Sequence, residues 1–285
     1  MFPASFDYHS ASSVAEAIEM LQKLPDAQLV AGGHSLIPAM KLRAAQPANV
    51  VDIARIPGLD GIERDGDDLV IGALATHAAV ADSAAVQGAC PGLAEAAAAI
   101  GDIQVRNRGT IGGSLAHADP GADYPATMLA FGAEITAVGP GGERTVAAAD
   151  FFVDLFQTVL DEADVITSVR IPAAAGTAYL KHPHPASSYA VVGAAARIAV
   201  SGGEVTACAL GIGGVAGKAV LADAAASALI GGAASDERIA AASARIGEAL
   251  DEPLGDLYAS GAFRVHLAGV YGKRALQIAA TRAAG

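Results

Sequence analysis

Two glycine-rich segments are the strongest candidates for binding chemistry in this sequence: AGGHS at residues 31–35 and GTIGGS at residues 109–114. The first stands between a predicted strand and a predicted helix that Ser35 opens. Glycines in a strand-to-helix turn let backbone N–H groups converge on one point, which suits the oxygens of a phosphate. AGGHS has neither the GxGxxG pattern nor the GK[ST] ending of a P-loop. Taken alone, it also fits a tight turn that tolerates positive φ.

The second turn favours a ligand with two phosphates. A diphosphate needs donors from more than one side, and GTIGGS predicts a second row of N–H groups with the Thr110 and Ser114 hydroxyls as extra donors. A dinucleotide cofactor held between two parts of the chain is the simplest ligand that uses both turns. The formal net charge of −12 does not conflict with this, because backbone amides carry no formal charge.

Polar residues around the turns have two interpretations each. His34 contacts a phosphate directly, or its ring bonds a neighbouring backbone group in the turn. Arg106 and Arg108 bind the diphosphate or, the interpretation we favour, brace their loop through carboxylates such as Asp119. His117 is interpreted as a residue that hydrogen-bonds within the loop. No catalytic dyad stands out, so no catalytic residue is assigned.

The length and net charge of the chain limit the classes of partner that it can bind. A chain of 285 residues predicts two or three domains. An acidic balance argues against nucleic acid and against an anionic membrane surface as partners. The first residues, MFPASFDYHS, do not have the form of a secretory signal. No apolar run approaches the ~18–20 residues that a membrane span needs. We therefore expect a cytoplasmic location without a membrane span.

Metal chemistry in this chain is not expected. The two cysteines, Cys90 and Cys208, have no partner at metal-ligand spacing and are predicted to be buried small hydrophobes. A structural zinc or an iron–sulfur cluster held by this chain alone is therefore not predicted. His182 and His184 are two residues apart without a third ligand nearby, which indicates a surface loop.

The surrounding elements alternate between helices and strands, which predicts an α+β fold. Ser13 with Glu16 has capping-box form, Thr76 is predicted to cap a short helix, and Asp65-Gly66 predicts a hairpin turn. Residues 103–125 show no helical periodicity and are predicted to be a long irregular, functional segment. Further expected helices cover 14–24, 93–101, 125–131, 222–230, 237–249 and 264–280; expected strands cover 28–31, 50–53, 134–138, 144–146, 165–171, 195–201 and 204–211.

The two glycine segments also carry a family resemblance. AGGHSLIPAMKLR (31–43) and IQVRNRGTIGGSLAHADPGADYP (103–125) resemble the two FAD-binding motifs of the flavoprotein (medium) subunit of molybdenum hydroxylases, the xanthine dehydrogenase and carbon monoxide dehydrogenase family. The resemblance covers nearly the whole chain in order. Supporting segments are FDYHSASSVAEAIEML (6–21), DVITSVRIP (164–172), YLKHPHPASSYAVVGAAARI (179–198) and YGKRAL (271–276).

The resemblance implies a two-part FAD-binding domain of the PCMH/VAO type, followed by a C-terminal α+β domain with an antiparallel sheet and helices. The expected boundaries are 1–56 for the small α/β subdomain, 57–175 for the larger α+β subdomain and 176–285 for the C-terminal domain. FAD would lie between the two subdomains. The resemblance also implies a basic residue, Lys181, near the flavin ring, where a positive charge stabilises the reduced ring, and an aromatic residue, Tyr189, near the isoalloxazine.

The cofactor-binding residues that the resemblance implies fall into four groups. They are Leu29, Val30, Ala31, Gly32, Gly33, His34, Ser35 and Leu36 around the first turn; Thr110, Ile111, Gly112, Gly113 and Ser114 in the second; Asp123 at the polar part of the cofactor; and three further contacts, Ile166 as an apolar contact and Lys181 and Tyr189 near the ring.

By resemblance, the chain is the FAD-binding electron-transfer subunit of a heterotrimeric molybdenum hydroxylase, assembled as a dimer of heterotrimers. Molybdopterin would lie on a large partner and two iron–sulfur ([2Fe-2S]) clusters on a small one. Electrons would pass through FAD to an external acceptor: NAD, a quinone or oxygen. Two alternatives stay open: a stand-alone FAD oxidoreductase of the same wider fold, and a flavin-free assembly module.

Overall fold

The N-terminal part of the chain is a small three-stranded parallel sheet between two helices. The structure is a computed structural model that describes residues 1–284. The elements of this part are β1 (Asp7–Ser10), α1 (Val14–Lys23), β2 (Ala27–Val30), α2 (Leu36–Lys41) and β3 (Asn49–Asp52), and the strand order is β1-β3-β2. Alternate side chains of a strand point to opposite faces. Val51 of β3 packs with Ala17 of α1, whereas Val50 packs with Met40 of α2. The two helices therefore cover opposite faces.

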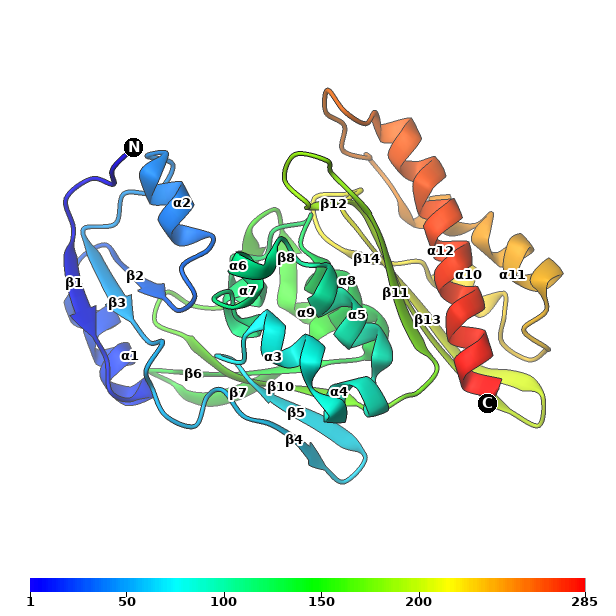
Figure 1. The fold of residues 1–285 in the computed structure, drawn as a ribbon, viewed down its shortest axis with the longest axis horizontal. Coiled ribbons are helices and arrows are strands. Elements are labelled where there is room, and N and C mark those ends of the chain that lie inside the picture. Colours follow the sequence, from blue (N-terminus) through cyan, green and yellow to red (C-terminus); the bar gives the residue numbers. More distant parts are fainter. Residues whose placement is uncertain (285) are drawn as a thin grey trace.

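The central part is an antiparallel sheet with helices packed over it. Its strand order is β4-β5-β10-β6-β7, and Figure 1 shows it running beneath the central helices. The fully buried Tyr124, Phe131 and Phe151 are the largest side chains of the core between sheet and helices. The elements are β4 (Ile62–Asp65), β5 (Asp68–Gly72), α3 (His77–Asp82), α4 (Ala84–Ala89), α5 (Pro91–Ala99), α6 (Ile103–Arg106), α7 (Ile111–His117), α8 (Asp123–Phe131), β6 (Glu134–Gly139), β7 (Gly142–Ala147), α9 (Ala148–Phe151), β8 (Phe152–Asp154), β9 (Gln157–Thr158) and β10 (Val165–Pro172).

The C-terminal part is an antiparallel sheet covered on both faces. Its order is β11-β12-β13-β14. The long helix α12 packs on β11 and β12 from one side, and α5 and α8 of the central part pack on the same sheet from the other (Figure 1). Burial on both faces explains why the first seven residues of β12 are all buried. The elements are β11 (Thr177–Pro183), β12 (Ala190–Ser201), β13 (Glu204–Gly213), β14 (Val220–Leu221), α10 (Asp223–Ser227), α11 (Asp236–Ser243), the 3₁₀ helix η1 (Ile246–Ala249) and α12 (Gly261–Ala284).

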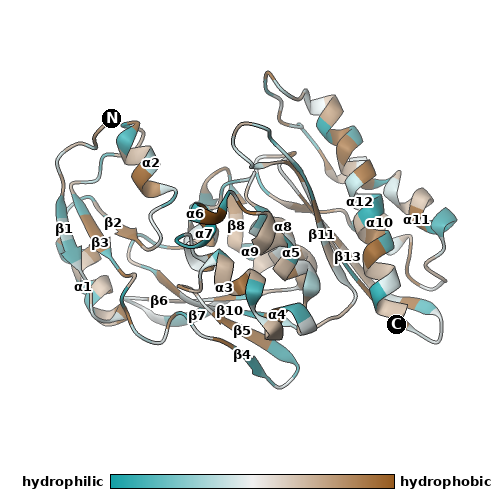
Figure 2. Cartoon of the chain, in the orientation of Figure 1, coloured by the Kyte–Doolittle hydropathy of each residue, from teal (hydrophilic) through white to brown (hydrophobic). Residues whose placement is uncertain are grey.

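The helix expected at 264–280 is present as α12 and buries one apolar face. Leu267, Ala268, Ala275, Leu276 and Ala279 of α12 are all buried. Figure 2 shows hydrophobic and hydrophilic segments alternating along this helix, as expected for one that packs a single face on a sheet. No helix within residues 1–284 combines the length and the hydropathy that a membrane crossing requires.

The predicted α+β class is confirmed, with an antiparallel sheet and helices at the C-terminal end. Most predicted elements are present within a few residues. One prediction is wrong: residues 103–125 are not irregular, because they contain α6, α7 and the first turn of α8. These helices are short and rich in glycine, so they show no helical period. The sequence analysis also missed β1, a four-residue edge strand. The three-domain division stays a prediction.

Both cysteines are expected to be unreactive in the folded protein. Burial raises the pKa of the Cys90 thiol to about 11 and that of Cys208 to about 12. Since the thiolate is the nucleophile, we expect neither cysteine to be alkylated by iodoacetamide at pH 7.5 until denaturant is added. Mass spectrometry of tryptic peptides measures this, and labelling of Cys90 without denaturant would contradict it. Within residues 1–284, no group of histidine, cysteine and acidic side chains is arranged to hold a metal.

Candidate cofactor-binding site

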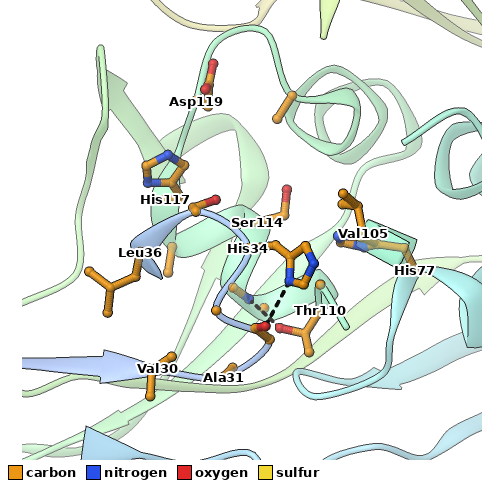
Figure 3. Close-up of a pocket in the computed structure, with 18 of the residues that line it drawn as sticks. Val30, Ala31, His34, Leu36, His77, Val105, Thr110, Ser114, His117 and Asp119 are labelled. Carbon is orange, nitrogen blue, oxygen red and sulfur yellow. Dashed lines mark hydrogen bonds between the residues drawn. The ribbon is translucent and has the colours of Figure 1, made fainter. Parts of the chain in front are cut away.

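A cavity of about 560 Å³ opens between the N-terminal sheet and the central part. Both glycine turns line it, and Figure 3 shows His34, Thr110 and Ser114 around its centre. Its size lies in the range of small-molecule sites. Of the predicted cofactor-binding residues, all except Ile111 and Lys181 line this cavity. Ile111 is fully buried behind the wall.

The first turn presents unused backbone donors. It follows β2, and Gly33 adopts the left-handed conformation with φ of 76°. The N–H groups of residues 31–35 donate to no other group within residues 1–284. These donors are open to water or to a ligand, because His34 is exposed and the other residues of the turn are only partly buried. Nδ1 of His34 lies 3.1 Å from the carbonyl oxygen of Gly32, so the ring of His34 bonds a neighbouring backbone group, which is the second of the two interpretations given above. The turn is therefore built to receive an acceptor.

The second turn corrects the sequence analysis. The N–H groups of Ile111 and Gly112 donate to the carbonyl oxygens of Ala75 and Ala73, at 3.0 and 2.9 Å. Those of Gly113 and Ser114 donate to the side chain and backbone of Thr110, at 3.1 and 3.0 Å. The predicted second row of free N–H groups is therefore wrong, because α7 and its neighbour use these donors. The Thr110 and Ser114 hydroxyl protons stay available to a ligand.

The first turn needs a glycine at position 32 because it touches the segment that leads into the second turn. A Cβ built on Gly32 would lie 2.0 Å from the carbonyl oxygen of Arg108, far inside contact distance. The first turn thus rests directly on the backbone that leads into the second. This contact joins the N-terminal sheet to the central part and fixes the width of the cavity between them.

The electrostatics of the cavity restrict how it binds an anion. Asp119, Asp123 and Asp164 line it, whereas no lysine or arginine does among residues 1–284. Arg144 pairs with Asp164 and Lys181 with Asp123, both from outside the cavity. Backbone N–H groups and hydroxyls must therefore supply the favourable interactions with an anionic ligand.

Lys181 lies behind Asp123 rather than in the cavity. Its Nζ is 2.9 Å from Asp123 Oδ1 and also donates to the carbonyl oxygens of Ala99 and Ser188, at 2.6 and 2.8 Å. The Tyr179 hydroxyl donates to the same Asp123 oxygen at 2.6 Å. Burial, the largest influence, raises the pKa of Asp123, and Lys181 and Tyr179 oppose this rise. Lys181 therefore acts on the cavity through Asp123.

A loop from β11 to β12 closes one end of the cavity. Tyr189 lines the cavity and is 43% exposed. The N–H of Ser188 donates to the His184 carbonyl oxygen at 2.8 Å, and the N–H of Ala190 donates to that of Gly121 at 2.9 Å. This loop brings the aromatic ring of Tyr189 to the cavity, and its place near the isoalloxazine stays a prediction.

The predictions for Arg106 and His117 have different outcomes. Arg106 braces its loop, but through the carbonyl oxygens of Ile100 and Gly101 at 2.9 and 3.3 Å, and not through Asp119. The ring of His117 packs against Phe156, with the ring centres 5.2 Å apart.

The KHPHP segment is only partly a loop, which corrects the sequence analysis. His182 belongs to β11 and its Nδ1 lies 3.2 Å from the hydroxyl oxygen of Tyr271, whereas His184 follows the strand and packs against the Tyr258 ring.

The sequence analysis missed His77, a buried histidine that lines the cavity. The sequence predicted Thr76 as a helix cap and assigned no role to the histidine that follows it. The available signal was a histidine directly after that cap, at the end of an apolar run of sequence. Ile100 and Val105 line the same side and were not predicted either.

Comparison with known proteins assigns the family. Residues 4–174 match the family model described as FAD binding domain in molybdopterin dehydrogenase, and residues 177–279 match that of the CO dehydrogenase flavoprotein C-terminal domain. The chain is similar to the carbon monoxide dehydrogenase medium chain of Hydrogenophaga pseudoflava, with 43% identity over the full length of both chains.

Solved structures agree. A carbon monoxide dehydrogenase structure from Hydrogenophaga pseudoflava matches with a TM-score of 0.94, 44% identity and 99% of each chain covered. Quinoline 2-oxidoreductase from Pseudomonas putida 86 matches with a TM-score of 0.93, 33% identity and 99% of each chain covered. The chain therefore belongs to the FAD-binding subunits of the molybdenum hydroxylase family. Within it, the chain is similar to carbon monoxide dehydrogenase medium chains.

Proposed function

We propose that this chain is the FAD-binding electron-transfer subunit of a heterotrimeric molybdenum hydroxylase. A large partner would hold molybdopterin and a small partner the [2Fe-2S] clusters. When bound, FAD would supply the redox chemistry, taking electrons from the small partner's clusters and giving them to an external acceptor. The observation that carries this proposal is the first glycine turn: residues 31–35 line the cavity, and their N–H groups, which donate to no other group within residues 1–284, suit a diphosphate.

The cavity residues have distinct roles in this proposal. Residues 31–35 hold the diphosphate through backbone N–H groups, and the Thr110 and Ser114 hydroxyls donate from the opposite wall. Asp123, fixed by Lys181 and Tyr179, accepts hydrogen bonds from the polar part of the cofactor. The apolar side chains keep water from the ring, and Tyr189 covers the mouth; the apolar set is Leu29, Val30, Leu36, Ile100, Val105 and Ile166.

The sequence supports placing the clusters on a partner. A [2Fe-2S] cluster is normally held by four cysteine thiolates. This chain has two cysteines, one buried in the central core and one on β13 of the C-terminal sheet. Relatives as similar as these carry names with substrates as different as carbon monoxide and quinoline. We infer that the substrate is selected on another chain.

The test is the absorbance spectrum of the chain, purified alone and with its two partners. We expect a bound-flavin spectrum and co-purification of two further chains. FAD without partners would instead indicate a stand-alone oxidoreductase. No flavin, even with both partners and added FAD, would indicate a flavin-free assembly module and contradict the proposal.

A further inference from the structure

His77 lies where the second glycine turn meets α3. It is the first residue of that helix, after the cap Thr76, and its backbone N–H donates to the carbonyl oxygen of Gly109 at 3.0 Å. Its side chain is only 5% exposed and forms part of the cavity wall. Figure 3 shows the imidazole projecting from this wall toward His34. The backbone therefore holds the ring at a fixed place beside the turn.

The hydrogen bond on the far side of the ring selects one tautomer. His77 Nδ1 lies 3.3 Å from the hydroxyl oxygen of Tyr124, a fully buried residue. That hydroxyl has no other hydrogen-bond partner within residues 1–284. Since a buried hydroxyl donates its proton when an acceptor is in reach, Tyr124 donates to Nδ1. The single ring proton of neutral His77 is then on Nε2.

The ring is neutral at physiological pH. Burial, together with the nearby His34 and Arg106, lowers the pKa of His77 to about 4. Burial raises the pKa of the Tyr124 phenol far above its ordinary value, so the phenol keeps its proton. The pair is therefore an uncharged donor in a cavity wall that holds no lysine or arginine among residues 1–284.

The Nε2 atom of His77 has no partner within residues 1–284. A Cβ on Gly109 would lie 2.5 Å from it, so glycine at this position is what makes room for the imidazole edge. The side chains of Ile100 and Val105, which line the same side, offer no acceptor. Nε2 is reachable from the cavity, because no side-chain nitrogen or oxygen that is closed off from solvent lacks a partner within residues 1–284. A ligand in the cavity can therefore supply the acceptor atom for this N–H.

We propose that His77 is a cofactor-binding residue that donates a hydrogen bond from Nε2 to an acceptor oxygen of bound FAD, with Tyr124 as the positioning residue that fixes its tautomer. This inference rests on the proposed function, because FAD is the ligand. It adds a neutral side-chain donor to a site whose other donors are backbone amides and hydroxyls.

Histidine ¹⁵N NMR of the full chain tests the inference without any substitution. We expect the ¹⁵N chemical shift of His77 Nε2 to be that of a protonated ring nitrogen from about pH 8 down to about pH 5. We also expect this chemical shift to change when FAD is restored to the FAD-free chain. An Nδ1–H tautomer, or an Nε2 resonance that FAD does not shift, would overturn the inference. If the chain with its partners does not bind FAD at all, the proposed function fails instead.

Substitutions give a second readout, the dissociation constant for FAD from flavin fluorescence. We expect His77→Phe, which keeps the ring size, to weaken binding about tenfold. His77→Gln, which can place an amide N–H near Nε2, should restore much of the loss, and Tyr124→Phe should show mixed tautomers by NMR. The control is His266→Phe, an exposed position on α12. Equal affinity of His77→Phe and the wild type would also contradict the inference.

Discussion

The Gly32→Ala variant is expected to lose FAD binding by at least about 100-fold. The added Cβ would lie 2.0 Å from the Arg108 carbonyl oxygen, which is backbone and cannot rotate away. The first turn must then move away from the second. The N–H groups of residues 31–35 are thereby displaced from the positions in which they would bind the diphosphate. Loss of two charge-assisted hydrogen bonds, at about 1.5 kcal/mol or more each, corresponds to that factor.

The measurement is a flavin fluorescence titration of the variant, with circular dichroism to show that the fold persists. Gly141→Ala is the matched control, because a Cβ there has open space and the position lies in an exposed hairpin. The control should bind FAD like the wild type. If Gly32→Ala did so as well, the contact between the turns would not define the site. Gly32→Val enlarges the clash and should abolish binding.

Local signals in the sequence predicted local structure well. The Ser13 side chain accepts the N–H of Glu16, and that of Thr76 accepts the N–H of Ala79, both at 3.1 Å. Each cap depends on residues three positions apart, so the spacing alone was sufficient. Thr110 shows the limit of this reasoning. Its hydroxyl was predicted to serve a ligand, but its oxygen also caps α7, and that helix was not predicted.

The partners of the site residues could not be predicted from local spacing. Asp123 meets Lys181 across 58 positions, and His77 meets Tyr124 across 47. The resemblance placed Lys181 near the flavin ring, but its charge is used by Asp123 and two carbonyl oxygens. His77 has no motif of its own, and its burial arises only when α3 packs against the second turn. Tertiary packing, rather than residue type, decided both cases.

The buried pair of Lys181 and Asp123 carries the second large prediction. Lys181→Met is expected to lower the free energy of unfolding by about 3–5 kcal/mol, because it leaves the Asp123 carboxylate buried without its cation. The Lys181 and Asp123 side chains are only 6% and 5% exposed, so water replaces the lysine poorly. Equilibrium urea denaturation at pH 7 measures the loss.

Two further variants make this prediction specific. Lys23→Met removes the lysine of an exposed ion pair with Glu19, whose side chains are 72% and 64% exposed, and should change stability little. Adding Asp123→Asn to Lys181→Met removes the unpaired charge while keeping an acceptor for the Tyr179 hydroxyl, so it should recover part of the loss. A Lys181→Met loss no greater than that of Lys23→Met would contradict the prediction.

The pH dependence of the Lys181→Met variant follows from the same buried carboxyl. Burial already raises the pKa of Asp123 in the folded chain, and removal of Lys181 takes away the strongest opposing influence. A carboxyl whose folded pKa is raised favours the folded state most at low pH, where it is protonated in both states, and this advantage is lost as the pH rises through the folded pKa. The stability difference between the variant and the wild type should therefore be smallest near pH 4, about the pKa of an unfolded aspartate, and should grow toward neutral pH. A difference that instead grew on acidification would show that Lys181 stabilises the fold by some route other than Asp123.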